Sequence, residues 1–175
     1  PEDGEVLQQV RDVYVALRDF EAELGVLARL RVLAPEDAHH RLHLGYNLWR
    51  AGEHERARAE FLAILERPEL APLERVRVLV LLGRTPEALE LWGQELERDP
   101  AASEDVDTFV LIVAGLHQAG DVENAVEGYQ GLIEISAKFL EEREVRAFGL
   151  MPDVEATLLA LRAETLARHP ELAPK

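Results

Sequence analysis

The stretch Gly52-Glu53-His54-Glu55-Arg56-Ala57-x-x-x-Phe61 decides the fold of this chain, because its pattern occurs three times. The second copy reads Gly83-Arg84-Thr85-Pro86-Glu87-Ala88-x-x-x-Trp92, and the third reads Gly120-Asp121-Val122-Glu123-Asn124-Ala125-x-x-x-Tyr129. The mean interval between copies is 34 residues. A repeat of this length predicts a stack of similar units, each of which buries its apolar surface against its neighbours.

Composition and periodicity predict that these units are helical. Ala, Leu, Glu and Arg dominate the 175 residues, and all four are strong helix formers. Apolar residues recur at intervals of three and four, also from Val106 to Leu116, where β-branched residues are frequent. The expected helices span 4–17 and 20–33, 37–51 and 54–66, 71–82 and 86–98, 104–119 and 122–145, and 153–168.

Glycine and proline mark the breaks between the expected helices. Glycine supplies the left-handed conformation that closes a last helical turn, whereas proline suits the first turn of the next helix. The predicted short turns are Arg18-Asp19, Gly52-Glu53, Gly83-Arg84 and Gly120-Asp121. The predicted longer breaks are Ala34-Pro35-Glu36-Asp37, Arg67-Pro68-Glu69, Asp99-Pro100 and Gly149-Leu150-Met151-Pro152.

Residues in the first helix of each unit complete a family pattern. The second unit reads Arg41-x-x-Leu44-Gly45-x-x-Leu48, followed by Ala57-x-x-x-Phe61 and Pro68. These motifs resemble the tetratricopeptide repeat (TPR) family, and the resemblance covers residues 4 to about 139. It implies an all-α, right-handed TPR-like solenoid of antiparallel helical hairpins. After Tyr129 the pattern fades, and we expect the last helix to act as a C-terminal capping helix.

The resemblance predicts one domain over 1–175, with units at about 4–36, 37–69, 70–103 and 104–145 and a capping helix at 153–168. Small residues such as Gly45 and Ala57 are expected where two helices approach closely. Glu23 replaces that alanine in the first unit, which questions the tight crossing there and suggests a terminal cap with a more polar outer face. The aromatic slots are separated by 34, 31 and 37 residues, so a deletion precedes the third unit and an insertion, at 99–105, precedes the fourth.

The charge balance limits the partners. The formal net charge is −15, with a sequence pI near 4.8, and this disfavours nucleic acid and anionic membrane surfaces. No apolar run approaches the roughly 18 residues that a membrane span needs, and no signal peptide is visible. We therefore expect no membrane insertion and a cytoplasmic location. The chain begins at Pro1 without methionine, which fits a segment of a longer protein or a processed form.

Residues for catalysis are scarce. The chain has no cysteine, and its only serines are Ser103 and Ser136, so we expect neither enzymatic activity nor a cofactor. His39 and His43 lie four residues apart, a spacing that can bind a transition metal. Because no third ligand is evident, we expect surface or groove histidines and no metal.

The first helix of each unit lines a concave groove in families of this kind, and the register projects which residues face it. The predicted peptide-binding groove consists of Tyr46, Trp49, Arg50, Arg77, His117 and Gln118. The same projection adds Gln8, Asp12, Val15, His39, Leu42, Leu73, Val80, Val110 and Ala114. Trp, Tyr and Arg dominate binding hot spots, although Trp49 could equally pack against a neighbouring helix.

These observations predict a non-catalytic protein- or peptide-binding scaffold that acts through its concave face. A self-associating assembly module, using the last helix or the segment Phe148 to Met151, is one alternative. The interaction segment of a larger enzyme or regulator is another. Both a monomer and a homodimer remain open at this point.

Overall fold

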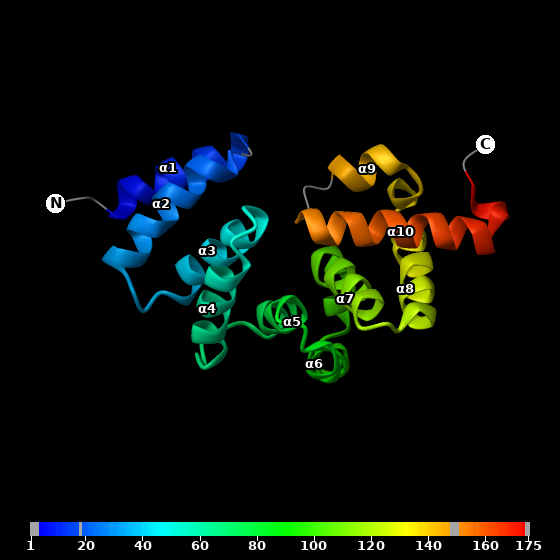
Figure 1. The fold of residues 1–175 in the computed structure, drawn as a ribbon. Helices are drawn as coiled ribbons and strands as arrows, with labels where there is room; N and C mark the ends of the chain where they lie inside the picture. Colours follow the sequence, from blue (N-terminus) through cyan, green and yellow to red (C-terminus); the bar gives the residue numbers. More distant parts are fainter. Residues whose placement is uncertain (1–3, 18, 148–150, 174–175) are drawn as a thin grey trace. The chain divides into compact units, whose positions relative to one another are not determined.

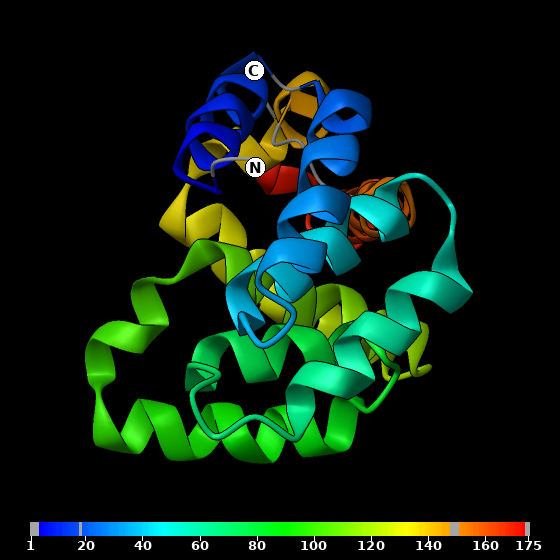
Figure 2. The same ribbon diagram turned by 90° about the vertical axis from the view of Figure 1, so that its left-hand side faces the viewer.

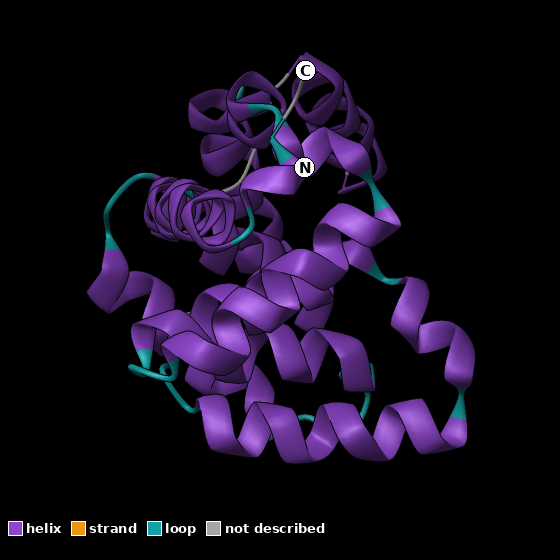
Figure 3. Ribbon diagram, turned by 90° about the vertical axis from the view of Figure 1, so that its right-hand side faces the viewer, coloured by secondary structure: helices purple, strands orange, loops and turns teal. Residues whose placement is uncertain are grey.

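The computed structural model describes residues 4–17, 19–147 and 151–173. Within these ranges the chain consists of helices, turns and loops, without any strand (Figure 3). The predicted all-α class is therefore confirmed. Two compact units, residues 1–70 and 71–175, divide the chain. The expectation that all repeats form one domain stays a prediction.

The first unit contains two antiparallel helical hairpins. Helices α1 (Gly4–Leu17) and α2 (Phe20–Leu33) form the first hairpin, drawn in two shades of blue in Figure 2. Helices α3 (Ala38–Arg50) and α4 (His54–Leu65) form the second, and α3 also packs against α2. The carboxylates of Asp19 and Asp37 cap α2 and α3 by accepting hydrogen bonds from the Ala22 and His40 backbone N–H groups.

The second unit contains two further hairpins and the C-terminal helices. Its long helices are α5 (Pro72–Leu81), α6 (Thr85–Arg98), α7 (Val106–Gln118), α8 (Val122–Ile135) and α10 (Pro152–Arg168). Helix α10 lies across α7 and α8, the position expected for a capping helix (Figure 1). Its Val154, Leu158 and Leu161 side chains are buried.

Three glycines close the first helices of their hairpins in the same way. Gly52, Gly83 and Gly120 have φ angles of 77°, 74° and 85°, which side-chain-bearing residues rarely adopt. In each turn the next residue donates its N–H to a leucine carbonyl five residues before it, at 2.9 Å. The first hairpin has the equivalent bond from Asp19 to Tyr14, at 3.0 Å, but Arg18 of that predicted turn lies outside the described residues.

The predicted helix at 122–145 is wrong in its second half. Helix α8 ends at Ile135 because Ser136 is extended, with φ −151° and ψ 113°. A 3₁₀ turn at Ala137–Leu140 and helix α9 (Glu142–Ala147) follow. The reversal buries Phe139 against the Tyr129 ring, and the Tyr129 hydroxyl donates a 2.8 Å hydrogen bond to the Phe139 carbonyl. The chain gives up the helical turns predicted after Ile135, because leaving the helix there allows Phe139 to pack on Tyr129.

The two changes in repeat spacing are absorbed differently. The deletion shortens α5 to 10 residues, compared with 13 in both α3 and α7. Three residues are close to one helical turn, so the packing face is kept. The insertion instead forms a separate 3₁₀ turn at Pro100–Glu104, in which Ala102 is buried.

Close packing within the hairpins rests on matched residue sizes. A Cβ atom on Gly45 of α3 would lie 2.4 Å from Cε1 of Phe61, a fully buried ring on α4. In the fourth hairpin, α7 and α8, Val113 stands in the position of Gly45 and Tyr129 in that of Phe61. The small residue is instead Gly128 of α8, whose Cβ would lie 2.7 Å from the Val113 Cγ2 atom. Both of these hairpins therefore place a glycine opposite a larger side chain.

We predict that Gly45→Ala lowers the free energy of unfolding by about 1–3 kcal/mol, because the new methyl group has to displace the buried Phe61 ring. Urea unfolding followed by circular dichroism measures this. Gly25→Ala is the matched control, since its Cβ would meet nothing within 4 Å and alanine favours the helix. Equal stability of the two variants would contradict the packing described.

A buried ion pair replaces the small residues in the first hairpin. Arg11 of α1 and Glu23 of α2 occupy the positions that Gly45 and Ala57 hold 34 residues later. Arg11 Nε lies 3.3 Å from Glu23 Oε1, and both side chains are buried. Glu23 therefore does not lie on the outer face of the first unit, because this carboxylate points into the hairpin. The role of this unit as a terminal cap stays a prediction.

Candidate protein-binding site

Helix α3 carries a row of aromatic rings on one face, at positions four and three residues apart. The ring centroids of His39 and His43 are 4.2 Å apart, and those of His43 and Tyr46 are 6.2 Å apart. Trp49 continues the row one turn later. His39 is exposed and the other three are half-buried. We call these four residues the α3 aromatic face.

Side chains of helix α4 pack against the α3 aromatic face. The fully buried Phe61 ring lies 5.6 Å from the Tyr46 ring and 6.1 Å from the Trp49 ring, measured between centroids. The exposed His54 meets Trp49 edge-on at 4.7 Å. Trp49 thus packs on the neighbouring helix and keeps part of its surface accessible.

His43 contributes an uncharged ring to this face. Burial, together with the nearby Arg11 guanidinium and the neighbouring His39 ring, lowers the pKa of His43 to about 3. The imidazole is therefore neutral at pH 7. A neutral, half-buried imidazole next to Tyr46 and Trp49 makes the surface mainly apolar, with a few hydrogen-bonding atoms.

Arg50 turns away from the aromatic face toward α2. Its guanidinium carbon lies 4.3 Å from the centroid of the Phe20 ring, a cation–π contact. Both residues line a cavity of about 420 Å³, and Asn47 lines its wall. Arg50 is half-buried, so it stands at the edge of the α3 aromatic face and does not extend the row of rings.

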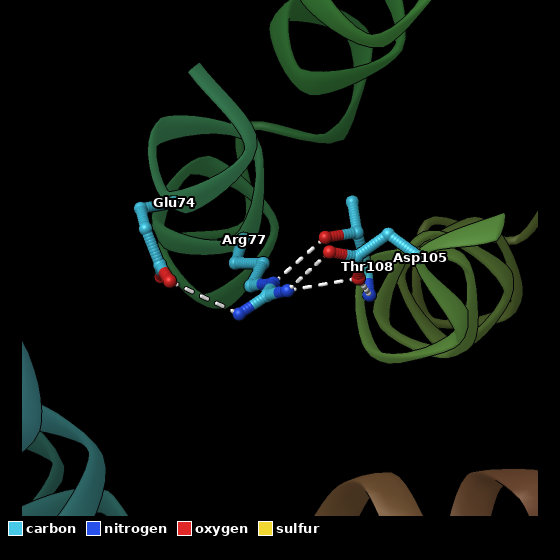
Figure 4. A network of polar contacts seen from close by, with 4 residues as sticks. All are labelled: Glu74, Arg77, Asp105 and Thr108. Atoms are coloured by element: carbon cyan, nitrogen blue, oxygen red, sulfur yellow. Dashed lines mark hydrogen bonds and ion pairs between the residues drawn. The ribbon is translucent and has the colours of Figure 1, made fainter. Parts of the chain in front are cut away.

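In the second unit Arg77 of α5 is held by residues of its own chain (Figure 4). Its guanidinium donates to both Asp105 oxygens at 2.8 Å, to Thr108 Oγ1 at 2.7 Å and to Glu74 at 3.1 Å. Burial raises the pKa of Asp105, but the Thr108 backbone N–H and the Arg77 guanidinium together hold it below its ordinary value. Arg77 thus fixes α5 to the start of α7.

His117 and Gln118 lie in the last turn of α7. His117 is half-buried, and the Gln118 amide donates a 3.5 Å hydrogen bond to Thr157 of α10. Nine residues separate Thr108 from His117, a distance of about 14 Å along a helix. The structure therefore does not bring His117 and Gln118 together with Arg77.

The repeat register predicted only in part which groove residues are exposed. Four residues that it assigned to the groove are buried and present no surface to a partner: Leu42, Val80, Val110 and Ala114. Phe61, His54 and Phe20, which contact the predicted site residues, were not predicted as part of the site. The Phe61 slot in the repeat was the one signal that could have indicated this support.

Within the described ranges, no three His, Asp or Glu side chains are grouped to hold a metal ion. None of the described helices is both long enough and apolar enough to span a bilayer. The α3 aromatic face can instead offer apolar contact, ring stacking and a few hydrogen bonds to another molecule.

The helical hairpins, their glycine-closed turns and the capping helix define an all-helical repeat protein with a TPR-like fold. No protein-family model and no curated protein matches the chain. Solved structures of MamA do match it over nearly its whole length. MamA 41-end from Desulfovibrio magneticus RS-1 is 18% identical, with a TM-score of 0.56, and the match covers 98% of this chain and 96% of that chain.

Two further MamA structures are similar. The structure described as MamA MSR-1 C2 is 12% identical with a TM-score of 0.58, covering 97% of this chain and 94% of that one. The MamA RS-1 ArsTM double mutant is 17% identical with a TM-score of 0.54, covering 98% of both chains. At these identities the likeness concerns the fold.

Proposed function

We propose that this chain is a member of the TPR family that acts as a non-catalytic scaffold, binding a protein or peptide through the first helices of its hairpins. The α3 aromatic face is the observation that carries the proposal. It presents Tyr46 and Trp49 on a rigid support, with the Arg50 guanidinium at its edge. Large aromatic rings and arginine contribute most of the energy at protein interfaces because they bury much surface at a low entropic cost.

The chemistry of this face favours a partner segment with apolar side chains. The neutral His43 and the Tyr46 and Trp49 rings offer contact area, while Arg50 favours a carboxylate at one end. Arg77, His117 and Gln118, which belong to the second unit, stay predicted binding residues. A partner that binds Arg77 has to compete with its existing bonds to Asp105, Thr108 and Glu74.

Selection of random 16-residue peptides on the parent protein, followed by affinity measurements, tests the proposal. We predict that Trp49→Ala/Arg50→Ala lowers the affinity for the selected peptides about 30-fold, which is the loss expected when a hot spot of about 2 kcal/mol is removed. Leu62→Ala, at an exposed position on α4, is the control and is expected to bind as the parent does. Circular dichroism verifies the fold of each variant. Unchanged affinity in the double variant would place binding elsewhere.

A further inference from the structure

Helix α1 exposes a stripe of apolar side chains, which we call the α1 stripe. Its members are Val6, Val10, Val13 and Leu17, with exposed fractions of 52%, 36%, 55% and 69%. Intervals of four, three and four residues place them on one helix face. Outside α1 and α2, the only large apolar side chains that the described ranges expose are Leu62 and Ile135. Exposed apolar surface is thus concentrated in the first hairpin.

The repeat register shows what the corresponding face does in α3. The residues 34 positions after the stripe are His40, Leu44, Asn47 and Ala51. Leu44 and Asn47 are buried, and both face α2: Leu44 lines a cavity with Ala28, and Asn47 lines one with Phe20. This face of α3 is therefore covered by a helix of the preceding hairpin.

The same face of α7 is covered in the same manner. Its register equivalents are Thr108, Ile112, Gly115 and Ala119. Thr108 accepts a hydrogen bond from Arg77 of α5, and a Cβ on Gly115 would lie 2.7 Å from Val80 of α5. Two helices of this chain thus use this face to pack on another helix, whereas α1 leaves its four positions exposed.

The exposed charges of α1 are acidic. Glu5 and Asp12 are the exposed charged side chains of α1 in its described residues, since Arg11 is buried with Glu23. The whole chain carries a net charge of −15. A second copy would bring one acidic α1 against another, which costs free energy.

We propose that the α1 stripe binds an amphipathic α-helix of a partner that has apolar residues along one face and lysine or arginine beside them. The stripe supplies the apolar contact that α2 supplies to α3. Glu5 and Asp12 each precede a stripe valine and so lie about 100° round the helix from it, where their charge favours basic residues in the partner. This surface is distinct from the α3 aromatic face and gives the scaffold a second binding site.

Three labelled 18-residue peptides test this proposal by fluorescence anisotropy at physiological salt. The first has a leucine stripe at helical spacing with lysine flanks, the second the same stripe with glutamate flanks, and the third the composition of the first with the stripe scrambled. We expect the first peptide to bind at least tenfold more tightly than either of the others. Val6→Gln/Val13→Gln is expected to weaken it at least tenfold, whereas Leu62→Gln, at another exposed apolar position, is not.

Each alternative outcome overturns the proposal in a recognisable way. Equal binding of the first and third peptides means that only charge is recognised. Loss of binding in Trp49→Ala, with binding kept in Val6→Gln/Val13→Gln, assigns the peptide to the α3 aromatic face. A dimer of the parent in sedimentation velocity that Val6→Gln/Val13→Gln abolishes assigns the stripe to a second copy. Glutamine favours a helix over valine, so the variant is expected to keep its fold.

Discussion

Replacing Glu23 with leucine is expected to lower the free energy of unfolding by about 3–5 kcal/mol, because Arg11 would remain as a buried charge without its partner. Both side chains are nearly inaccessible, with exposed fractions of 6% for Arg11 and 2% for Glu23. Native domains are stable by only about 5–15 kcal/mol, so the variant is expected to unfold at a markedly lower urea concentration. Urea unfolding followed by circular dichroism measures the change.

The double variant Arg11→Met/Glu23→Leu separates the charge from the packing. It removes both desolvated groups, and we expect it to restore the stability of the parent or to exceed it by about 1–4 kcal/mol. Arg56→Met breaks the exposed pair with Glu53, and its effect is expected to be several-fold smaller because water already solvates both groups. A Glu23→Leu variant no less stable than Arg56→Met would show that the pair is not desolvated.

Lowering the pH from 7 to 5 is expected to destabilise the protein, with His43 alone contributing about 2 kcal/mol. Burial, then the charge of Arg11, and then His39, Arg50 and His40 lower the pKa of His43 from 6.5 to about 3. Below pH 6.5 the unfolded chain binds a proton at this ring that the folded chain does not bind. The stability is therefore complete above pH 6.5 and is lost progressively toward pH 3.

The variant His43→Leu isolates this contribution. Its side chain cannot titrate, so its loss of unfolding free energy between pH 7 and pH 5 is expected to be about 2 kcal/mol smaller than that of the parent. Urea titrations at both pH values supply the four free energies. Equal losses for parent and variant would mean that His43 is protonated in the folded state at pH 5.

The sequence predicted most of the helices because the signals for them are local. Helical spacing of apolar residues, glycine closures and proline starts place nearly every predicted boundary within a residue or two of the structure. The segment after Ile135 could not be predicted in this way. Its chain reversal depends on burying Phe139 against Tyr129 and on a hydrogen bond from Arg162 to the Leu140 carbonyl, 22 residues away. Contacts of this range leave no periodic signal.

The site was predicted less completely than the fold. Register identified Tyr46 and Trp49 on a partly accessible face, but it could not predict that Arg77 is bound to Asp105 within the insertion before α7. It also could not show that Arg11 and Glu23, two departures from the repeat, compensate each other. Each of these two residues departs from the repeat pattern, and the reason is visible only once the ion pair between them is known.

The small residue at the helix crossing lies on α3 in the second hairpin and on α8 in the fourth, and this difference limits how the array can be recombined. Gly45 faces Phe61 across the second hairpin, whereas Val113 faces Gly128 across the fourth. A chimera that joined α7 to α4 would place valine beside Phe61 and Glu60, the register counterpart of Gly128, and would overfill the crossing. One that joined α3 to α8 would keep a ring, Tyr129, in the position of Phe61 but would remove the valine that packs on Gly128. Duplication or transplantation of repeats is therefore expected to succeed when the cut lies between hairpins and to fail when it lies within one.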